Sequence, residues 1–429
     1  MLWAYMVEWG SLLLRWLHVI TAIARIGSYF FFMHLDASLR ATPAIAKGGV
    51  AWEVHGGGFY EMRKYLVAPD QMPEELTWHK WQSYWTWISG FSLLVWIYYG
   101  QSSLYLINPD TMPLEPWQAA LLGVGGLALG WAVYDTSCRF LVGRNDAALA
   151  ALVFAFVIGM SWGWAHLFSG RGALIHTGAL MATMMTGNVF LNIIPNQRKV
   201  VADLIAGRTP NPAFGKQAKQ RSTHNNYFTL PVLFMMLSNH YPTTYANNAT
   251  IPLTVTLVIV AGAVIRHFFN VRHSVHGDSF KSPWWAWAVA ALALWTAFWV
   301  GMASSPSGRE RLNLSPLEPA RAAAPDKRTD ATAGRAVRLA SAAQPPKPVV
   351  DIIATRCGMC HSAEPVQDGI QIAPKAVMFD TPAEIAREAD AIRVQAVMTH
   401  AMPPNNVTEM KPEERAALAQ WLMARTAGE

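Results

Sequence analysis

The fold is decided by uncharged, strongly apolar stretches, of which the clearest is residues 283–304, PWWAWAVAALALWTAFWVGMAS. A helix needs about 20 such residues to cross a bilayer, where every backbone polar group has to be satisfied inside the segment. Seven further stretches are also strongly apolar and carry at most two charged residues each: residues 10–35, 81–107, 115–136, 147–168, 171–195, 227–241 and 250–270. Of the 429 residues, 52% are hydrophobic and only 14% are charged, which excludes a disordered chain and disfavours an ordinary soluble enzyme. Residues 1–304 are therefore predicted to be an all-α, polytopic membrane helix bundle of about eight spans.

The distribution of Lys and Arg gives the orientation of the bundle. The loops after odd-numbered spans hold 15 of these residues, whereas the loops after even-numbered spans hold only Arg171. The positive-inside rule places the odd loops in the cytoplasm, so that both termini lie outside. The net charge of +6 is thus accounted for by membrane orientation and does not indicate nucleic-acid binding.

The chain changes character after the last span. Residues 305–348 are rich in Ala, Pro, Ser and Arg and show no hydrophobic period, which predicts a flexible linker. Residues 349–429 regain helical patterns and are predicted to form a small soluble domain.

The strongest chemical motif lies at the start of that domain. Cys357, Cys360 and His361 form C-x-x-C-H, the attachment signature of haem c, in which the thiols bind the porphyrin and the histidine binds the iron. Met402, set among prolines, is the expected second iron ligand, with Met378 and Met398 as rivals. The alternative is a redox or zinc C-x-x-C, but the chain has no second ligand pair for zinc. We therefore expect a class I-like cytochrome c domain with covalent haem c, on the outer side where bacteria attach this group.

Two histidines lie at similar depth below the outer surface, on different spans. His18 is about eight residues into the first span, and His176 is about five residues into the fifth. Such a pair could ligate a haem b, and the alternative is that both are hydrogen-bonded structural histidines.

A denser set of polar residues lies near the cytoplasmic ends of the spans. It includes Asn192, His224, Arg266, His267 and Asn270. Amides, imidazoles and an arginine suit a planar, hydrogen-bonding anion, and the alternative is helix capping with lipid-headgroup contacts. Arg25 lies in the middle of the first span, so it needs a partner or a watery cavity.

Several of these segments resemble the membrane-bound cytochrome c urate oxidases, also called urate hydroxylases, of bacterial purine breakdown. The matching stretches are RWLHVIT (15–21), TGNVF (186–190), IPNQ (194–197), HNNY (224–227), SNHYP (238–242) and RHFFN (266–270). The resemblance runs from the first to the seventh span, and family members have a cytochrome c domain fused to the membrane domain. One departure is Arg25, where the family pattern has Trp; if Arg25 lines the site, substrate handling differs.

The resemblance implies oxidation of urate to 5-hydroxyisourate in the bacterial inner membrane, with both termini and the cytochrome c domain in the periplasm. The electrons pass to haem c and then to a respiratory-chain acceptor, such as a soluble cytochrome c or a terminal oxidase, without peroxide. Urate is a monoanion at neutral pH, so Arg266 is the expected anion partner, with His267 or His224 as general base and Asn192 as a hydrogen-bonding group. The expected partners are urate, membrane lipid and the respiratory-chain acceptor, and no nucleic acid.

Other functions remain open at this point. The same architecture could oxidise another small heterocycle or a quinol, or act as a non-catalytic electron-transfer subunit or a transporter. A transporter predicts an internal repeat, which the spans do not show. A cytoplasmic substrate site also lies about 30 Å from an outer haem c. A haem b held by His18 and His176 would bridge that distance.

Overall fold

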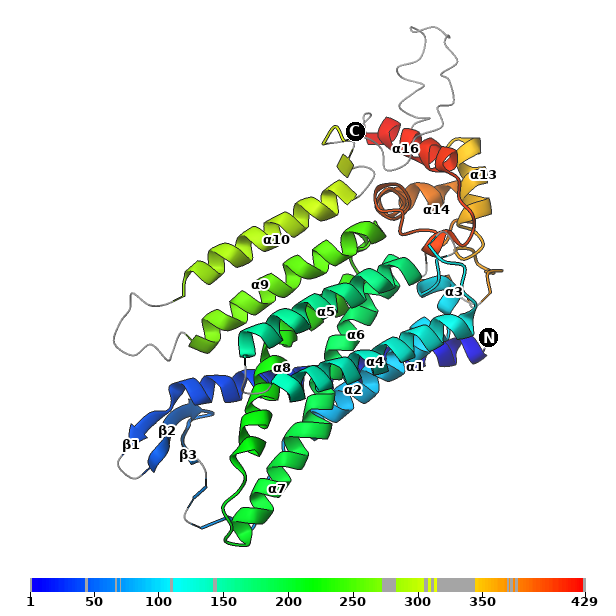
Figure 1. Ribbon diagram of the computed structural model, residues 1–429. Coiled ribbons are helices and arrows are strands. Elements are labelled where there is room, and N and C mark those ends of the chain that lie inside the picture. The colour runs from blue at the N-terminus through cyan, green and yellow to red at the C-terminus, as the bar shows by residue number, and fades with distance from the viewer. Residues whose placement is uncertain are drawn as a thin grey trace.

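A computed structural model of the chain describes residues 2–42, 45–65, 68–69, 71–108, 111–141, 145–271, 283–304, 308–309, 312–314, 344–368, 370, 373–374 and 377–426. Long helices lie side by side, with a small sheet at one end of the bundle and a cluster of short helices at the other (Figure 1). Most of the predicted linker, 305–348, falls outside the described residues.

The long helices match the predicted spans. They are α1 (Leu2–Ser38), α2 (Trp81–Leu93) with the π-helical η1 (Leu94–Tyr99), α4 (Pro116–Leu141), α5 (Asp146–Leu167), α6 (Gly170–Gly187), α8 (Pro212–Ser238), α9 (Ile251–Val271) and α10 (Trp285–Ser304). Six helical stretches of the described chain are long and apolar enough to cross a membrane: α1, α4, α5, the stretch from α6 through α7, α9 and α10. The other two predicted spans are also helical, but α2 with η1 ends at Tyr99 and the first half of α8 is polar. Eight spans therefore stay a prediction.

Two predicted helix boundaries are wrong. The fifth span continues through η2 (Asn188–Ile193) into α7 (Ile194–Ile205), and α8 begins at Pro212 rather than at residue 227. The Asn211 side chain caps α8 by accepting a hydrogen bond from the Ala213 amide. The polar helices α7 and α8 pack on each other and project beyond the bundle (Figure 1). Apolar stretches could not reveal these extensions, because a polar helix carries no hydropathy signal.

The prediction of an all-α chain is wrong between α1 and α2. Three antiparallel strands form there: β1 (Arg40–Thr42), β2 (Ile45–His55) and β3 (Gly58–Tyr65). Gly56 and Gly57, with φ values of +61° and +81°, make the two-residue turn of the β2–β3 hairpin. Glycine adopts such positive φ values without strain, so a Gly-Gly pair between β-forming residues is a hairpin signal.

Small residues in the core of the bundle let neighbouring helices pack closely against each other. At Gly178 of α6, an added Cβ would lie 2.7 Å from the Cβ of Met235 on α8. Membrane helices use small residues in this way because packing, rather than hydrophobic exclusion, holds them together. α1, by contrast, exposes large apolar side chains such as Trp9, Leu12 and Ile23, as expected for a lipid-facing helix.

The C-terminal domain has its own hydrophobic core. Its elements are α13 (Lys347–Arg356), α14 (Pro382–Arg387), α15 (Ala389–Ile392), η7 (Arg393–Met398), η8 (Pro404–Asn406) and α16 (Pro412–Thr426). Ile353, Ile385 and Leu418 are fully buried in this core. The turn η8 contacts α3 (Ser102–Tyr105), which follows η1 at the end of the bundle away from the sheet (Figure 1). Two further turns, η3 (Pro242–Thr244) and η4 (Asn248–Thr250), connect α8 to α9.

Candidate functional site

Buried polar side chains gather in one layer at the sheet end of the bundle. We call this set the inner polar layer; its members are Arg25, Ser83, Tyr134, Asp135, Thr186, Asn188, Asn192, Arg221, Asn225, Asn226 and Arg266. All are less than a tenth exposed. Because buried polar groups are costly unless paired, their contacts show what each one does.

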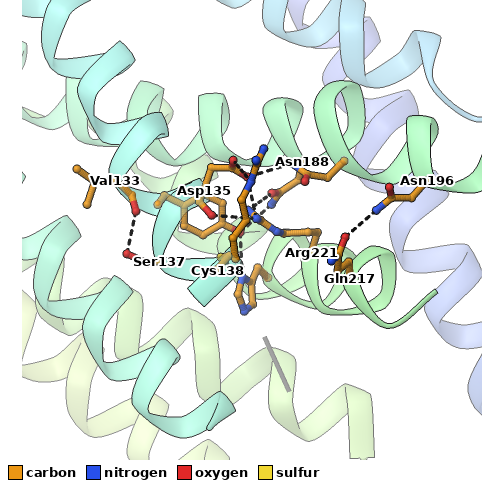
Figure 2. Close-up of polar contacts among 12 residues, drawn as sticks. Val133, Asp135, Ser137, Cys138, Asn188, Asn196, Gln217 and Arg221 are labelled. Carbon is orange, nitrogen blue, oxygen red and sulfur yellow. Dashed lines mark hydrogen bonds and ion pairs between the residues drawn. The ribbon is translucent and has the colours of Figure 1, made fainter. Parts of the chain in front are cut away.

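An ion pair lies at the centre of this layer. Nη2 of Arg221 lies 2.7 Å from Oδ1 of Asp135, and its Nη1 donates to Oδ1 of Asn188 at 3.1 Å (Figure 2). The second carboxylate oxygen of Asp135 lies 2.7 Å from Nε of the exposed Arg139. The predicted site residue Asn192 donates to Asp135 at 3.2 Å. Both buried charges are therefore neutralised within the protein, which makes this ion pair a structural element of the layer.

The predicted base His224 belongs to the same network. Its Nδ1 lies 2.8 Å from the Tyr134 hydroxyl, to which Asn188 also donates at 2.8 Å. The Cys138 thiol lies 3.9 Å from the same ring nitrogen. Among the described residues, Nε2 of His224 has no hydrogen-bond partner. The geometry therefore fixes the imidazole through one nitrogen and leaves the other available.

A cavity of about 300 Å³ lies beside the ion pair. Its lining is rich in cations and amides: Cys138, Arg139, Leu191, Asn192, Pro195, Asn196, Lys199, Phe214, Gln217, Gln220 and Arg221. Asn196 donates to Gln217 at 3.1 Å on its wall (Figure 2). With three cations in its lining and Asp135 behind it, the cavity has a net positive charge and suits an anion.

Arg266 forms a second cluster, close to the first. Its Nε donates to Oδ1 of Asn226 at 3.1 Å and its Nη2 to Oδ1 of Asn270 at 3.4 Å. The guanidinium also lies over the Phe30 ring, 4.2 Å from the ring centroid. The predicted anion partner thus already has two amide acceptors and an aromatic face.

His267 lies apart from both clusters. Its Nδ1 contacts the Tyr227 hydroxyl at 3.2 Å, and its ring packs near Trp285 of α10. Of the four predicted catalytic residues, the structure brings Asn192 and His224 into one network, and places Arg266 beside it through the neighbouring amides Asn225 and Asn226.

The predicted haem b ligands each have other contacts. Nδ1 of His18 lies 3.1 Å from both the Thr86 carbonyl and the Ser89 hydroxyl. In His176, Nδ1 contacts the Gly172 carbonyl at 2.8 Å and Nε2 contacts the Tyr99 hydroxyl at 3.0 Å. These contacts suit structural histidines, and a haem b held by this pair stays a prediction.

The C-x-x-C-H motif forms one turn directly after α13. The His361 amide donates to the Cys357 carbonyl at 2.9 Å, and Cys357 and Cys360 are free thiols. Nδ1 of His361 lies 2.9 Å from the Val377 carbonyl, which fixes the ring and leaves Nε2 as the nitrogen that would bind an iron. Burial lowers the pKa of His361 and so favours the neutral imidazole that metals bind. Burial also raises the pKa of Cys357 to about 12.

The rest of the domain fits a haem c. The buried Nε1 of Trp421 and Nδ2 of Asn405 have no hydrogen-bond partner among the described residues. Such orphaned donors suit the propionate groups of a porphyrin. The backbone of Met402 is held at both ends, since its amide donates to the Gln395 carbonyl at 2.9 Å and its carbonyl accepts from Arg415 at 2.9 Å. Cys357, Cys360, His361 and Met402 are therefore the residues that would hold the group.

Sequence reasoning missed Asp135, Arg221 and Tyr134. Arg221 lies in the polar first half of α8, which carries no hydropathy signal and cannot be told from a loop in the sequence. A usable signal was the acidic residue Asp135 at the end of an apolar run, four residues before Arg139. A carboxylate at the end of an apolar run needs a cationic partner. The exposed Arg139 at i+4 pairs with only one of the two Asp135 oxygens, so a second partner is expected for the other.

These features define a class: a helical protein with membrane-spanning character, a buried polar layer and a separate small C-terminal domain. Comparison with known proteins gives the family. The family model described as urate oxidase N-terminal matches residues 4–301, and the chain belongs to this family. Neither the curated proteins nor the solved structures contain a significant match. The match covers nearly all of the bundle and ends before the C-terminal domain, so it supports an oxidoreductase related to urate oxidation.

Proposed function

We propose that this chain oxidises urate to 5-hydroxyisourate at the inner polar layer and passes the electrons to a haem c in residues 349–429. One observation supports this proposal above the others. A urate oxidase N-terminal region and a C-x-x-C-H domain whose histidine is already oriented are joined in the same chain. A urate oxidase that uses oxygen directly has no need of such a domain.

The reaction balances without oxygen. Urate gives up two electrons, the oxygen of a water molecule bonds to C5, and two protons are released. When bound, haem c supplies a one-electron acceptor at the outer side of the membrane, from which a respiratory-chain acceptor such as a soluble cytochrome c is reduced. No peroxide is formed, because oxygen takes no part.

The protein's own residues hold the anion and move the proton. The inner polar layer provides amides and cations in a medium of low dielectric, where each hydrogen bond to an anion is strong. Of the two candidate bases, His224 belongs to the inner polar layer network, and its Nδ1 is held by Tyr134 while Nε2 stays available. We therefore assign His224 as the general base that removes a proton from the attacking water. His267 faces Trp285 and Tyr227 instead.

The test uses the purified full-length protein in detergent, with urate, a soluble cytochrome c and water labelled with heavy oxygen. We expect cytochrome c reduction without oxygen, one labelled oxygen in the product and no peroxide. Turnover that requires oxygen and releases peroxide would contradict the proposal. Reduction by a quinol but not by urate would instead support the electron-transfer alternative.

A further inference from the structure

Three buried arginines lie in the inner polar layer, and they differ in how their guanidinium groups are satisfied. Arg221, 3% exposed, has a carboxylate and an amide acceptor. Arg266, 6% exposed, has two amide acceptors on its Nε and Nη2. Arg25, 4% exposed, donates from Nη1 to the Thr186 hydroxyl at 2.9 Å and has the Tyr29 side chain beside it.

The second edge of the Arg25 guanidinium is formed by Nε and Nη2. Its Nε and Nη2 are buried and have no hydrogen-bond partner among the described residues. No carboxylate in the described part of the chain lies within ion-pair distance of Arg25. A buried cation without an anion is strongly unfavourable, and more so inside a membrane. The fold holds this charge in place, so the missing partner is expected to come from a ligand.

The two free nitrogens define the shape of that ligand. Nε and Nη2 lie on the same side of the planar guanidinium and donate in parallel, which matches two adjacent acceptors in one plane. On Arg266 this same edge is filled by Asn226 and Asn270. The inner polar layer thus provides amide acceptors for Nε and Nη2 of Arg266, whereas no described residue provides acceptors for the same two atoms of Arg25.

Two other groups lie around Arg25. The Ser83 hydroxyl of α2 is also buried without a partner among the described residues, and the Ser83 carbonyl lies 3.5 Å from the Thr186 hydroxyl that Arg25 contacts. The Tyr29 ring lies 5.9 Å from Cζ of Arg25, and its hydroxyl accepts from Asn225 at 2.9 Å. Thr186 of α6 therefore links Arg25 of α1 to Ser83 of α2, and the Tyr29 ring of α1 lies beside the guanidinium.

We propose that Arg25 binds the substrate anion side-on, through Nε and Nη2, with the Ser83 hydroxyl as an additional hydrogen-bonding group. The ligand is a planar anion with two adjacent in-plane acceptors, which the N–C–O edge of the urate monoanion provides. This inference rests on the proposed function and gives the substrate a binding residue. Arg221 and Arg266 then build the layer, and Arg25 recognises the ligand.

The experiment measures urate binding without turnover. The full-length protein is kept fully reduced with dithionite under anaerobic conditions, so that it cannot accept electrons, and urate is titrated by calorimetry. Arg25→Met keeps a similar length and removes the charge; we expect urate affinity to fall about 100-fold. Arg25→Lys keeps the charge and loses the fork, so we expect a fall of about tenfold.

The unfolding temperature of the Arg25 variants shows whether Arg25 recognises the ligand or only supports the fold. Because Arg25 is unpaired without ligand, Arg25→Met should unfold at a temperature no lower than wild type, while the stabilisation by added urate disappears. A residue that merely holds the fold would lower the unfolding temperature instead. The matched control is Arg15→Gln, an exposed arginine on the same helix, which should leave urate affinity unchanged.

The outcomes are distinct. Wild-type binding that Arg25→Met and Arg25→Lys leave within twofold would overturn the inference and leave the proposed function standing. Loss of binding in Lys199→Gln, with Arg25→Met unaffected, would overturn it by placing the anion in the cavity beside Asp135. If urate neither binds to nor is oxidised by the wild-type protein, the proposed function fails, and the inference fails with it.

Discussion

The C-terminal domain and the inner polar layer organise their chemistry in opposite ways. In the domain, Cys357, Cys360 and His361 lie on one turn, and a single carbonyl from Val377 orients the histidine. In the layer, the central contacts join residues from different helices, such as Asp135 of α4 with Arg221 of α8. A motif on one turn survives changes elsewhere in the chain, whereas an assembled layer depends on the packing of the whole bundle. Substitutions in the two regions should therefore have different consequences.

The largest effect is expected in the domain. Cys357→Ala combined with Cys360→Ala removes both attachment points, so covalent haem should be lost completely, together with urate-dependent cytochrome c reduction. Haem staining of the denatured protein measures this. Urate binding by the layer should persist in the same variant, and Cys138→Ala should keep its haem. A haem-stained band in the double variant would contradict the assignment.

The next effect is expected at the centre of the layer. Asp135→Ala leaves Arg221 buried without its carboxylate, which should cost about 3–5 kcal/mol of unfolding free energy. Denaturant unfolding in detergent, followed by tryptophan fluorescence, measures the loss. Arg139→Ala removes the exposed partner of the same carboxylate and should cost less than about 1 kcal/mol. Equal losses in both variants would show that the buried pair has no special role.

A smaller effect is expected on turnover alone. His224→Gln should lower the rate of urate oxidation about 100-fold, because a general base contributes that much or more. Urate affinity in the reduced protein should change little. The exposed His166 on α5 provides the control, and His166→Gln should keep the full rate. If His267→Gln is the variant that loses turnover, the base lies on the α10 side of the bundle instead.

The smallest effect is expected at the edge of the layer. Tyr29→Phe removes the acceptor of one hydrogen bond from Asn225 and should cost about 1 kcal/mol of unfolding free energy. Asn225 keeps its bond to the Met185 carbonyl at 3.0 Å, which limits the loss. Tyr241→Phe, at an exposed tyrosine, should be neutral in the same unfolding assay. A loss of several kcal/mol would mean that the whole layer rearranges.

The same contrast explains how much could be predicted from the sequence. Long apolar helices are visible from local composition, and the C-x-x-C-H motif is a contiguous signal. Arg221 was invisible as a layer residue, because it lies in a polar stretch and its role comes from Asp135, 86 positions away in the chain. The hairpin at residues 45–65 was missed although Gly56 and Gly57 signalled its turn, since the apolar spans on either side dominated the interpretation. The sequence shows Arg25 as a charge in the middle of a span, but its proposed role rests on Nε and Nη2, which have no partner in the described part of the chain.

The most direct test of the central claim is an anaerobic titration of the oxidised, full-length protein with urate, with no other acceptor present, following the haem c absorption band. If urate is the electron donor, each urate should reduce about two haems, since haem c takes one electron at a time. The reduced band should not form in the variant that lacks both Cys357 and Cys360. A haem that stays oxidised in the presence of urate, but is reduced by a quinol, would contradict the claim.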